Sequence, residues 1–113
     1  HNEDAFQFIV ANINDADCSE VHWILNFSSD KEFQKLLSLL KNCQHTSHFY
    51  WAKTASERCL APTDLQNIAA EMQLHGTVFH SVGEALATAQ VKASPNDLIF
   101  VGGSTFVVAD LAL

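Results

Sequence analysis

The order of hydrophobic patterns along the chain is the feature that most constrains its fold. Stretches with apolar residues at helical spacing alternate four times with short runs of β-branched and aromatic residues. Strands joined by helical connections pair in parallel through right-handed crossovers, and the helices then cover both faces of the sheet. The sequence therefore predicts an α/β fold with a Rossmann-like open, mostly parallel sheet. With 113 residues the chain is too short for a TIM barrel and suits a single domain, residues 1–113.

Local patterns define the individual elements. Asn2 is a suitable helix N-cap, and the acidic residues after it favour the positive end of the helix dipole. Gly76 is expected to end the third helix and Ser81 to begin the fourth. The expected strands are 21–27, 48–51, 77–80 and 97–101. The first expected helix is 2–14, and the second follows the capping residues 28–30. The third runs from Pro62 to Gly76, the fourth begins at Ser81, and a last apolar helix is expected at 105–113.

The charge balance excludes two classes of partner. The net charge is −7, and binding to nucleic acid or to an anionic membrane surface needs clustered positive charge. No apolar run approaches the length of a membrane span, and no signal peptide is visible. An anionic ligand would have to be held by local features, such as one lysine or a helix N-terminus.

Several kinds of catalytic or metal site are missing from the sequence. The three cysteines are odd in number and lack a CxxC spacing, which predicts reduced thiols in a cytoplasmic protein. No GxGxxG or GxxxxGK[ST] loop appears, and no nucleophile elbow is present. The histidines form no HxxxH or HExxH pattern, so we expect none of them to bind a metal: His1, His22, His45, His48, His75 and His80.

Ligands of open α/β sheets bind beyond the carboxyl ends of the strands. This rule selects the segments 26–31, 52–58, 80–83 and 102–106. In the last of them, Ser104 and Thr105 could offer free N–H groups to an anion, although a plain strand-to-helix turn with an N-cap explains the same residues.

Two basic residues lie in the other segments. Lys31 is in the expected first turn of a helix, where the dipole disfavours a cation, and its ammonium could hold a carboxylate. The alternative is a solvated lysine beside Asp30 and Glu32. Asp30 and Arg58 are candidate loop or substrate contacts, although Arg58 could simply bond the carbonyls of its own loop.

Four segments, taken in order, resemble one enzyme family. His1-Asn2 looks like the end of an Asp-x-Ala-His-Asn motif, and residues 30–32 and 55–59 look like an Asp-Lys-Asp segment and an Ala-x-x-x-Arg-Ala stretch. The most distinctive segment is 97–110, DLIFVGGSTFVVAD. Together they resemble the C-terminal domain of bacterial bifunctional folylpolyglutamate synthase/dihydrofolate synthases, which belong to the Mur ligase superfamily.

The resemblance implies an ATP-dependent ligase that joins glutamate to dihydropteroate or folate through an acyl phosphate. It places His1 and Asn2 on the nucleotide side, and Lys31, Ser104 and Phe106 around the incoming glutamate. It also implies ATP and magnesium as cofactors of the full-length enzyme, with an N-terminal ATPase domain of the same chain as the partner. We expect no cofactor bound to residues 1–113 alone, and no ligation by them.

The chain also departs from the family. It begins at His1, so we expect a fragment that lacks the motif's first residues and the strand before them. A missing inner strand would leave an edge that allows a fragment dimer. Asn26 stands where the family often has Gly. A stand-alone Rossmann-like binding or interaction module remains the alternative, because the phosphate loop is absent.

Overall fold

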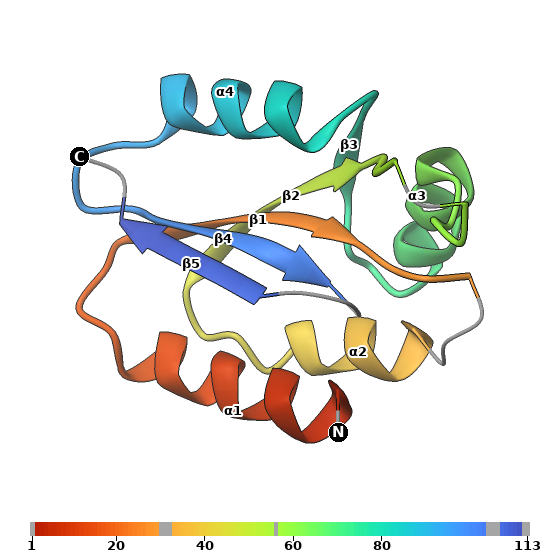
Figure 1. Cartoon of the computed structure of the whole chain (residues 1–113). Helices are drawn as coiled ribbons and strands as arrows, with labels where there is room; N and C mark the ends of the chain where they lie inside the picture. The colour runs from red at the N-terminus through yellow and green to blue at the C-terminus, as the bar shows by residue number, and fades with distance from the viewer. Residues whose placement is uncertain (1, 30–32, 56, 104–106, 112–113) are drawn as a thin grey trace.

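The computed structural model describes residues 2–29, 33–55, 57–103 and 107–111. These residues form one open sheet in the order β3-β2-β1-β4-β5, with helices on both of its faces (Figure 1). The elements are α1 (Asn2–Asp15), β1 (Glu20–Asn26), α2 (Phe33–Leu40), β2 (Thr46–Ala52), α3 (Pro62–Glu71), β3 (Gly76–Phe79), α4 (Val82–Lys92), β4 (Leu98–Gly103) and β5 (Val107–Leu111).

The predicted fold class is confirmed. Strands β1 to β4 are mutually parallel, and β1 lies between β2 and β4. The four expected strands and the first four expected helices are all present. Ser81 caps α4 as predicted, because its hydroxyl accepts the N–H of Glu84 at 3.0 Å.

The last predicted helix is wrong. Residues 107–111, expected within a helix at 105–113, form strand β5, which pairs antiparallel with β4. Val107 and Val108 suit a strand as well as a helix, and only residues 104–106 connect the two strands, a length typical of hairpins. In this pairing, the backbone N–H and C=O groups of β4 and β5 bond to each other. A helix packed on the sheet would not give β4 these backbone partners.

We also expected the sheet to lack an inner strand. The structure shows no such gap, because β4 pairs directly with β1. Each of the five described strands bonds to its neighbour, so the sheet is continuous. Gln66 of α3 also donates to the carbonyl of Gly76 at 2.9 Å and so occupies one backbone group of the edge strand β3. A fragment dimer stays a prediction.

Gly76 has a different role from the predicted one. Helix α3 ends at Glu71, and the left-handed turn after it is made by Gln73, with φ 66°. Gly76 instead begins β3, where a Cβ would lie 2.5 Å from the carbonyl oxygen of Phe49. Glycine is needed there for close packing of β3 on β2 rather than for the end of the helix.

The two faces of the sheet are packed differently. Helices α1, α2 and α3 cover one face and share an aromatic core, in which Phe6 and Trp23 both contact Phe100. Helix α4 alone packs on the other face through Ala85 and Ala89, which are fully buried. Because strand side chains alternate, His22 and Asn26 share this second face with Ile24. The second face therefore carries polar groups at both of its ends.

Candidate functional site

Ligand binding was predicted at the carboxyl ends of the parallel strands. Asn26 ends β1, and its side-chain amide donates to the carbonyl of Ala52 at 2.9 Å and to the Sγ of Cys59 at 2.8 Å. The first of these bonds joins the ends of β1 and β2, and the second joins β1 to the loop that follows β2. Asn26 is only 8% exposed, so this amide is a buried group with its donors satisfied.

Backbone hydrogen bonds connect the loops at this edge. Ser29 N–H donates to the carbonyl of Arg58 at 2.7 Å, and Leu60 N–H donates to the carbonyl of Phe27 at 2.9 Å. Lys53 N–H donates to the carbonyl of Phe79, at 3.2 Å, and so ties the same loop to β3. The segments predicted from the strand ends at 26–31 and 52–58 are therefore held together by main-chain contacts.

Strand β4 reaches the same place through Gly103. Gly103 pairs with Asn26, and a Cβ on it would collide with the carbonyl group of Asn26. A residue without a side chain is required for this approach.

The structure locates two of the predicted site residues. Asn2 begins α1, and Figure 1 shows this end of α1 on the same side of the molecule as the end of β1. Arg58 contributes its carbonyl to Ser29. The other predicted site residues lie outside the described part of the chain: His1, Asp30, Lys31, Ser104 and Phe106. The roles of all seven stay predictions.

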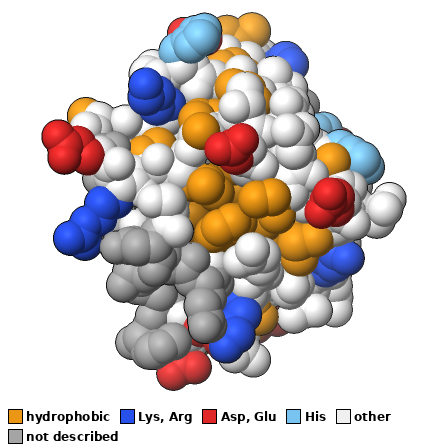
Figure 2. Space-filling model, turned by 90° about the vertical axis from the view of Figure 1, so that its right-hand side faces the viewer, with side chains coloured by type: hydrophobic (Ala, Val, Ile, Leu, Met, Phe, Trp, Pro, Cys, Tyr) orange, Lys and Arg blue, Asp and Glu red, His pale blue; other side chains and the backbone are white. Residues whose placement is uncertain are grey.

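The surface on this side of the molecule is apolar at its centre. Figure 2 shows hydrophobic side chains gathered in the middle of the view, with charged side chains of both signs around them. An apolar patch with a polar rim is typical of a surface that contacts another protein or domain.

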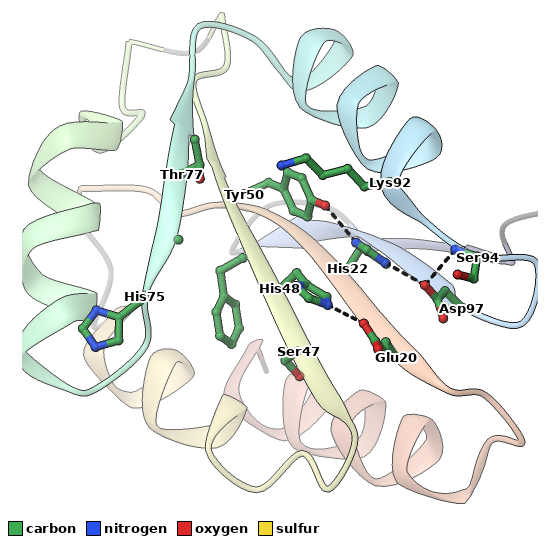
Figure 3. Close-up of a pocket in the computed structure, with 12 residues that line it drawn as sticks. Glu20, His22, Ser47, His48, Tyr50, His75, Thr77, Lys92, Ser94 and Asp97 are labelled. Atoms are coloured by element: carbon green, nitrogen blue, oxygen red, sulfur yellow. Dashed lines mark hydrogen bonds and ion pairs between the residues drawn. The ribbon is translucent and has the colours of Figure 1, made fainter.

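A polar pocket of about 270 Å³ lies at the opposite, amino end of the sheet (Figure 3). His22 and Asp97 form its floor and are 2% and 3% exposed. His22 Nε2 lies 3.0 Å from Asp97 Oδ2, and His22 Nδ1 lies 2.8 Å from the hydroxyl of Tyr50. The order carboxylate, imidazole, hydroxyl is the same as in a catalytic triad.

The charge of Asp97 organises this pocket. Burial alone would raise the pKa of Asp97, but N–H groups of Ser94 and Glu20 and the ring of His22 hold this pKa below its ordinary value. Asp97 is therefore a carboxylate that accepts from His22 Nε2, and the other ring nitrogen of His22 bonds to the hydroxyl of Tyr50. Burial and the charge of Asp97 raise the pKa of Tyr50. All three side chains are buried, and their bonds join β1, β2 and the residue before β4.

A second histidine lies beside this network. His48 faces His22 across β1 and β2, and their rings stack with centroids 4.7 Å apart. His48 Nε2 lies 2.5 Å from Glu20 Oε1, but both side chains are 44% exposed. Within residues 2–29, 33–55, 57–103 and 107–111, no three acidic, histidine or cysteine side chains come together as metal ligands.

Sequence reasoning missed this pocket. The hint was a histidine inside each of two otherwise hydrophobic strands, at His22 and His48. Their partner Asp97 is far away in sequence, and its proximity depends on the position of β4 beside β1.

Comparisons with known proteins concern the fold. No known family model matches the chain, and no curated protein matches it in sequence. Among the described residues, no helix is long and apolar enough to cross a membrane.

Solved structures match the chain closely in shape. A Yersinia pestis bifunctional folylpolyglutamate synthase/dihydrofolate synthase complexed with AMPPNP and Mn matches 92% of this chain, with a TM-score of 0.77 and 24% sequence identity. Escherichia coli FolC in complex with ADP matches 92% of the chain, with a TM-score of 0.76 and 20% identity. The chain shares their fold. It spans 24% of the length of each of these two proteins, and a further structure with Mn, AMPPNP and L-glutamate bound has a TM-score of 0.71 and 22% identity.

Proposed function

We propose that the chain is the C-terminal domain of a folylpolyglutamate synthase/dihydrofolate synthase, an ATP-dependent ligase that joins L-glutamate to dihydropteroate or folate through an acyl phosphate. The observation that carries the proposal is the agreement in fold with such enzymes over 92% of the chain. The ordered sequence segments support it independently, because they resemble the same family.

The edge at the carboxyl ends of the strands is the part that we assign to ligand binding. Lys31 would hold a carboxylate of the incoming glutamate as a point charge, and Ser104 and Phe106 would form the other side of that pocket. Asn2, with His1, would lie on the nucleotide side. The backbone hydrogen bond between Ser29 and Arg58 supports this assignment, since it holds together two of the loops concerned.

The rest of the proposed ligase would supply ATP and magnesium binding. ATP supplies the phosphoryl group that activates the substrate carboxylate. The sequence has no phosphate-binding loop, and the described side chains form no cluster for a metal ion. We therefore assign these parts to an N-terminal ATPase domain in the same protein, with the apolar patch of Figure 2 as a surface suited to contact between domains.

The proposal is tested by ATP-dependent ligation of labelled glutamate to dihydropteroate or tetrahydrofolate, with the full-length protein and residues 1–113 side by side. We expect activity in the full-length protein and none in residues 1–113. Inactivity of a folded full-length protein would contradict the proposal and favour a stand-alone binding or interaction module.

The assignment of Lys31 has its own test. In the full-length enzyme, Lys31→Ala should raise the KM for glutamate by about tenfold to a hundredfold, because a charge-assisted hydrogen bond to the substrate is lost. Lys92→Ala is the matched control, since Lys92 is an exposed lysine that lines the pocket at the other end of the sheet. An unchanged KM in Lys31→Ala would remove Lys31 from the site.

A further inference from the structure

Asn26 is the buried polar residue at which three of the predicted ligand segments meet. It is the last residue of β1, so the segment 26–31 begins there. Its side chain points to the face of the sheet that α4 covers, and it is 8% exposed. A polar side chain in such a place is retained only if its hydrogen bonds are made.

The side-chain amide of Asn26 donates hydrogen bonds to two different parts of the chain. One bond goes to the carbonyl of Ala52, the last residue of β2, and the other goes to the Sγ of Cys59 in the following loop. Cys59 Sγ also accepts the N–H of Thr54, at 3.4 Å. The sulfur is thus a shared acceptor that closes the loop 53–59 onto the end of β1.

The backbone of Asn26 makes the third connection. Gly103 pairs with it, and no side chain at Gly103 would fit against the Asn26 carbonyl. The described start of the segment 102–106 therefore takes a position set by Asn26. Asn26 thus begins the segment 26–31 and contacts the start of the other two segments, at Ala52 and at Gly103.

We propose that Asn26 is a positioning residue for glutamate binding, which acts by clamping the loop 53–59 and the end of β2 to β1. This inference rests on the proposed ligase function.

The clamp itself can be measured without enzyme activity. In the full-length protein, the rate at which a maleimide alkylates Cys59 is followed by mass spectrometry of the peptide that contains it. Asn26→Ala and Asn26→Leu should both raise this rate about tenfold, because the loop opens more often once two hydrogen bonds are lost. Asn26→Leu nearly keeps the shape of the side chain, adds no charge beside the thiol and has no N–H to donate, so it also covers the case in which the alanine variant fails to fold.

A matched control is available at the other end of the sheet. The Asn14 amide donates to the carbonyl of Asn42 at 2.9 Å, and its oxygen accepts the N–H of Gln44 at 2.8 Å. Asn14→Ala therefore removes an asparagine with two hydrogen bonds and should leave the alkylation of Cys59 unchanged. Equal rates in the wild type and Asn26→Leu would overturn the clamp.

The positioning role is tested by glutamate kinetics in the same variants. We expect Asn26→Leu and Asn26→Ala to raise the KM for glutamate about tenfold, with a smaller change in kcat and in the KM for ATP. A purely structural role would instead lower the amount of active enzyme and leave KM unchanged. Faster alkylation of Cys59 with an unchanged glutamate KM would therefore overturn the positioning role.

These outcomes separate the inference from the function on which it rests. A wild-type protein that ligates no glutamate contradicts the proposed function and, with it, the positioning role. If the wild type ligates glutamate and the Asn26 variants keep its glutamate KM and its rate of Cys59 alkylation, only the inference is contradicted.

Discussion

The two ends of the same parallel sheet are stabilised in different ways. At the amino end, the side chains of His22, Tyr50 and Asp97 bond mainly to one another and to nearby main-chain N–H groups, and they are buried. At the carboxyl end, main-chain groups of separate loops bond to each other, and Asn26 supplies the main side-chain link. The polar side chains of the amino end are therefore paired within that end, whereas the hydrogen bonds of the carboxyl end connect separate loops.

The comparison shows that a cluster of polar side chains does not by itself mark a catalytic site. His22 and Tyr50 have a triad-like order, yet Tyr50 is only 4% exposed and its hydroxyl joins β2 to β1 through His22. In open α/β sheets the carboxyl ends bind ligands. We therefore expect substitutions at the amino end to affect stability, and substitutions at the carboxyl end to affect both stability and function.

The largest effect is expected at Asp97. Asp97→Ala leaves His22 Nε2 and the Ser94 N–H without their buried acceptor, and should lower the free energy of unfolding by about 3 kcal/mol. Chemical denaturation of the variant and the wild type at pH 7 measures this loss. Ligation by the folded full-length variant should be unchanged, and a change in glutamate KM would break the proposed division between the two ends.

The same carboxylate predicts a pH dependence. Its pKa is lower in the folded than in the unfolded protein, so the folded state binds this proton less tightly. Its contribution is complete above the ordinary pKa of 3.8 and is lost as the pH falls through the folded value. Glu20→Gln is the control, because the half-exposed pair of Glu20 with His48 should contribute only a few tenths of a kcal/mol.

Gly103→Ala should have the next largest effect. The new methyl group collides with the backbone of Asn26, so β1 and β4 must separate at their ends, at a cost of about 2 kcal/mol. Thermal unfolding measures this cost, and the glutamate KM should rise in the same variant. A variant as stable as the wild type would show that the two strand ends do not need their close approach.

Tyr50→Phe should have the smallest effect of the three. It removes one buried hydrogen bond to His22 and should cost about 1 kcal/mol at pH 7. The folded pKa of Tyr50 is raised, so the stability linked to its proton is present below the ordinary value of 10.0 and is lost as the pH rises through the folded value. Unfolding curves from pH 8 to 11 should therefore fall less steeply for Tyr50→Phe than for the wild type, and parallel curves would contradict this.

Much of the fold could be predicted because its patterns are local. The run around Trp23 in β1 and the helical spacing of Phe33, Leu36 and Leu37 in α2 each indicate one kind of element. The segment 107–111 could not be assigned in this way, since a short apolar run is compatible with a helix or a strand until its partner is known. Its pairing with β4 is tertiary information.

The location of the candidate site could be predicted, but the hydrogen bonds that connect its parts could not. The rule for strand ends selected the edge where Asn26 lies. It could not show that Cys59 would become the acceptor of the Asn26 amide, because that bond depends on the path of the loop after β2. The pairing of His22 with Asp97 was hidden for the same reason, since it joins residues from β1 and the start of β4.

The strand order has a consequence for how the protein is made. β1 lies at the centre of the sheet, with β2 on one side and β4, which comes near the end of the described chain, on the other. During synthesis, one edge of β1 therefore has no partner until residues 98–103 have emerged, and the interval exposes a hydrophobic strand. Folding of this domain is governed by a late, non-local pairing, so shortening the chain before β4 should produce an aggregating product rather than a smaller folded one.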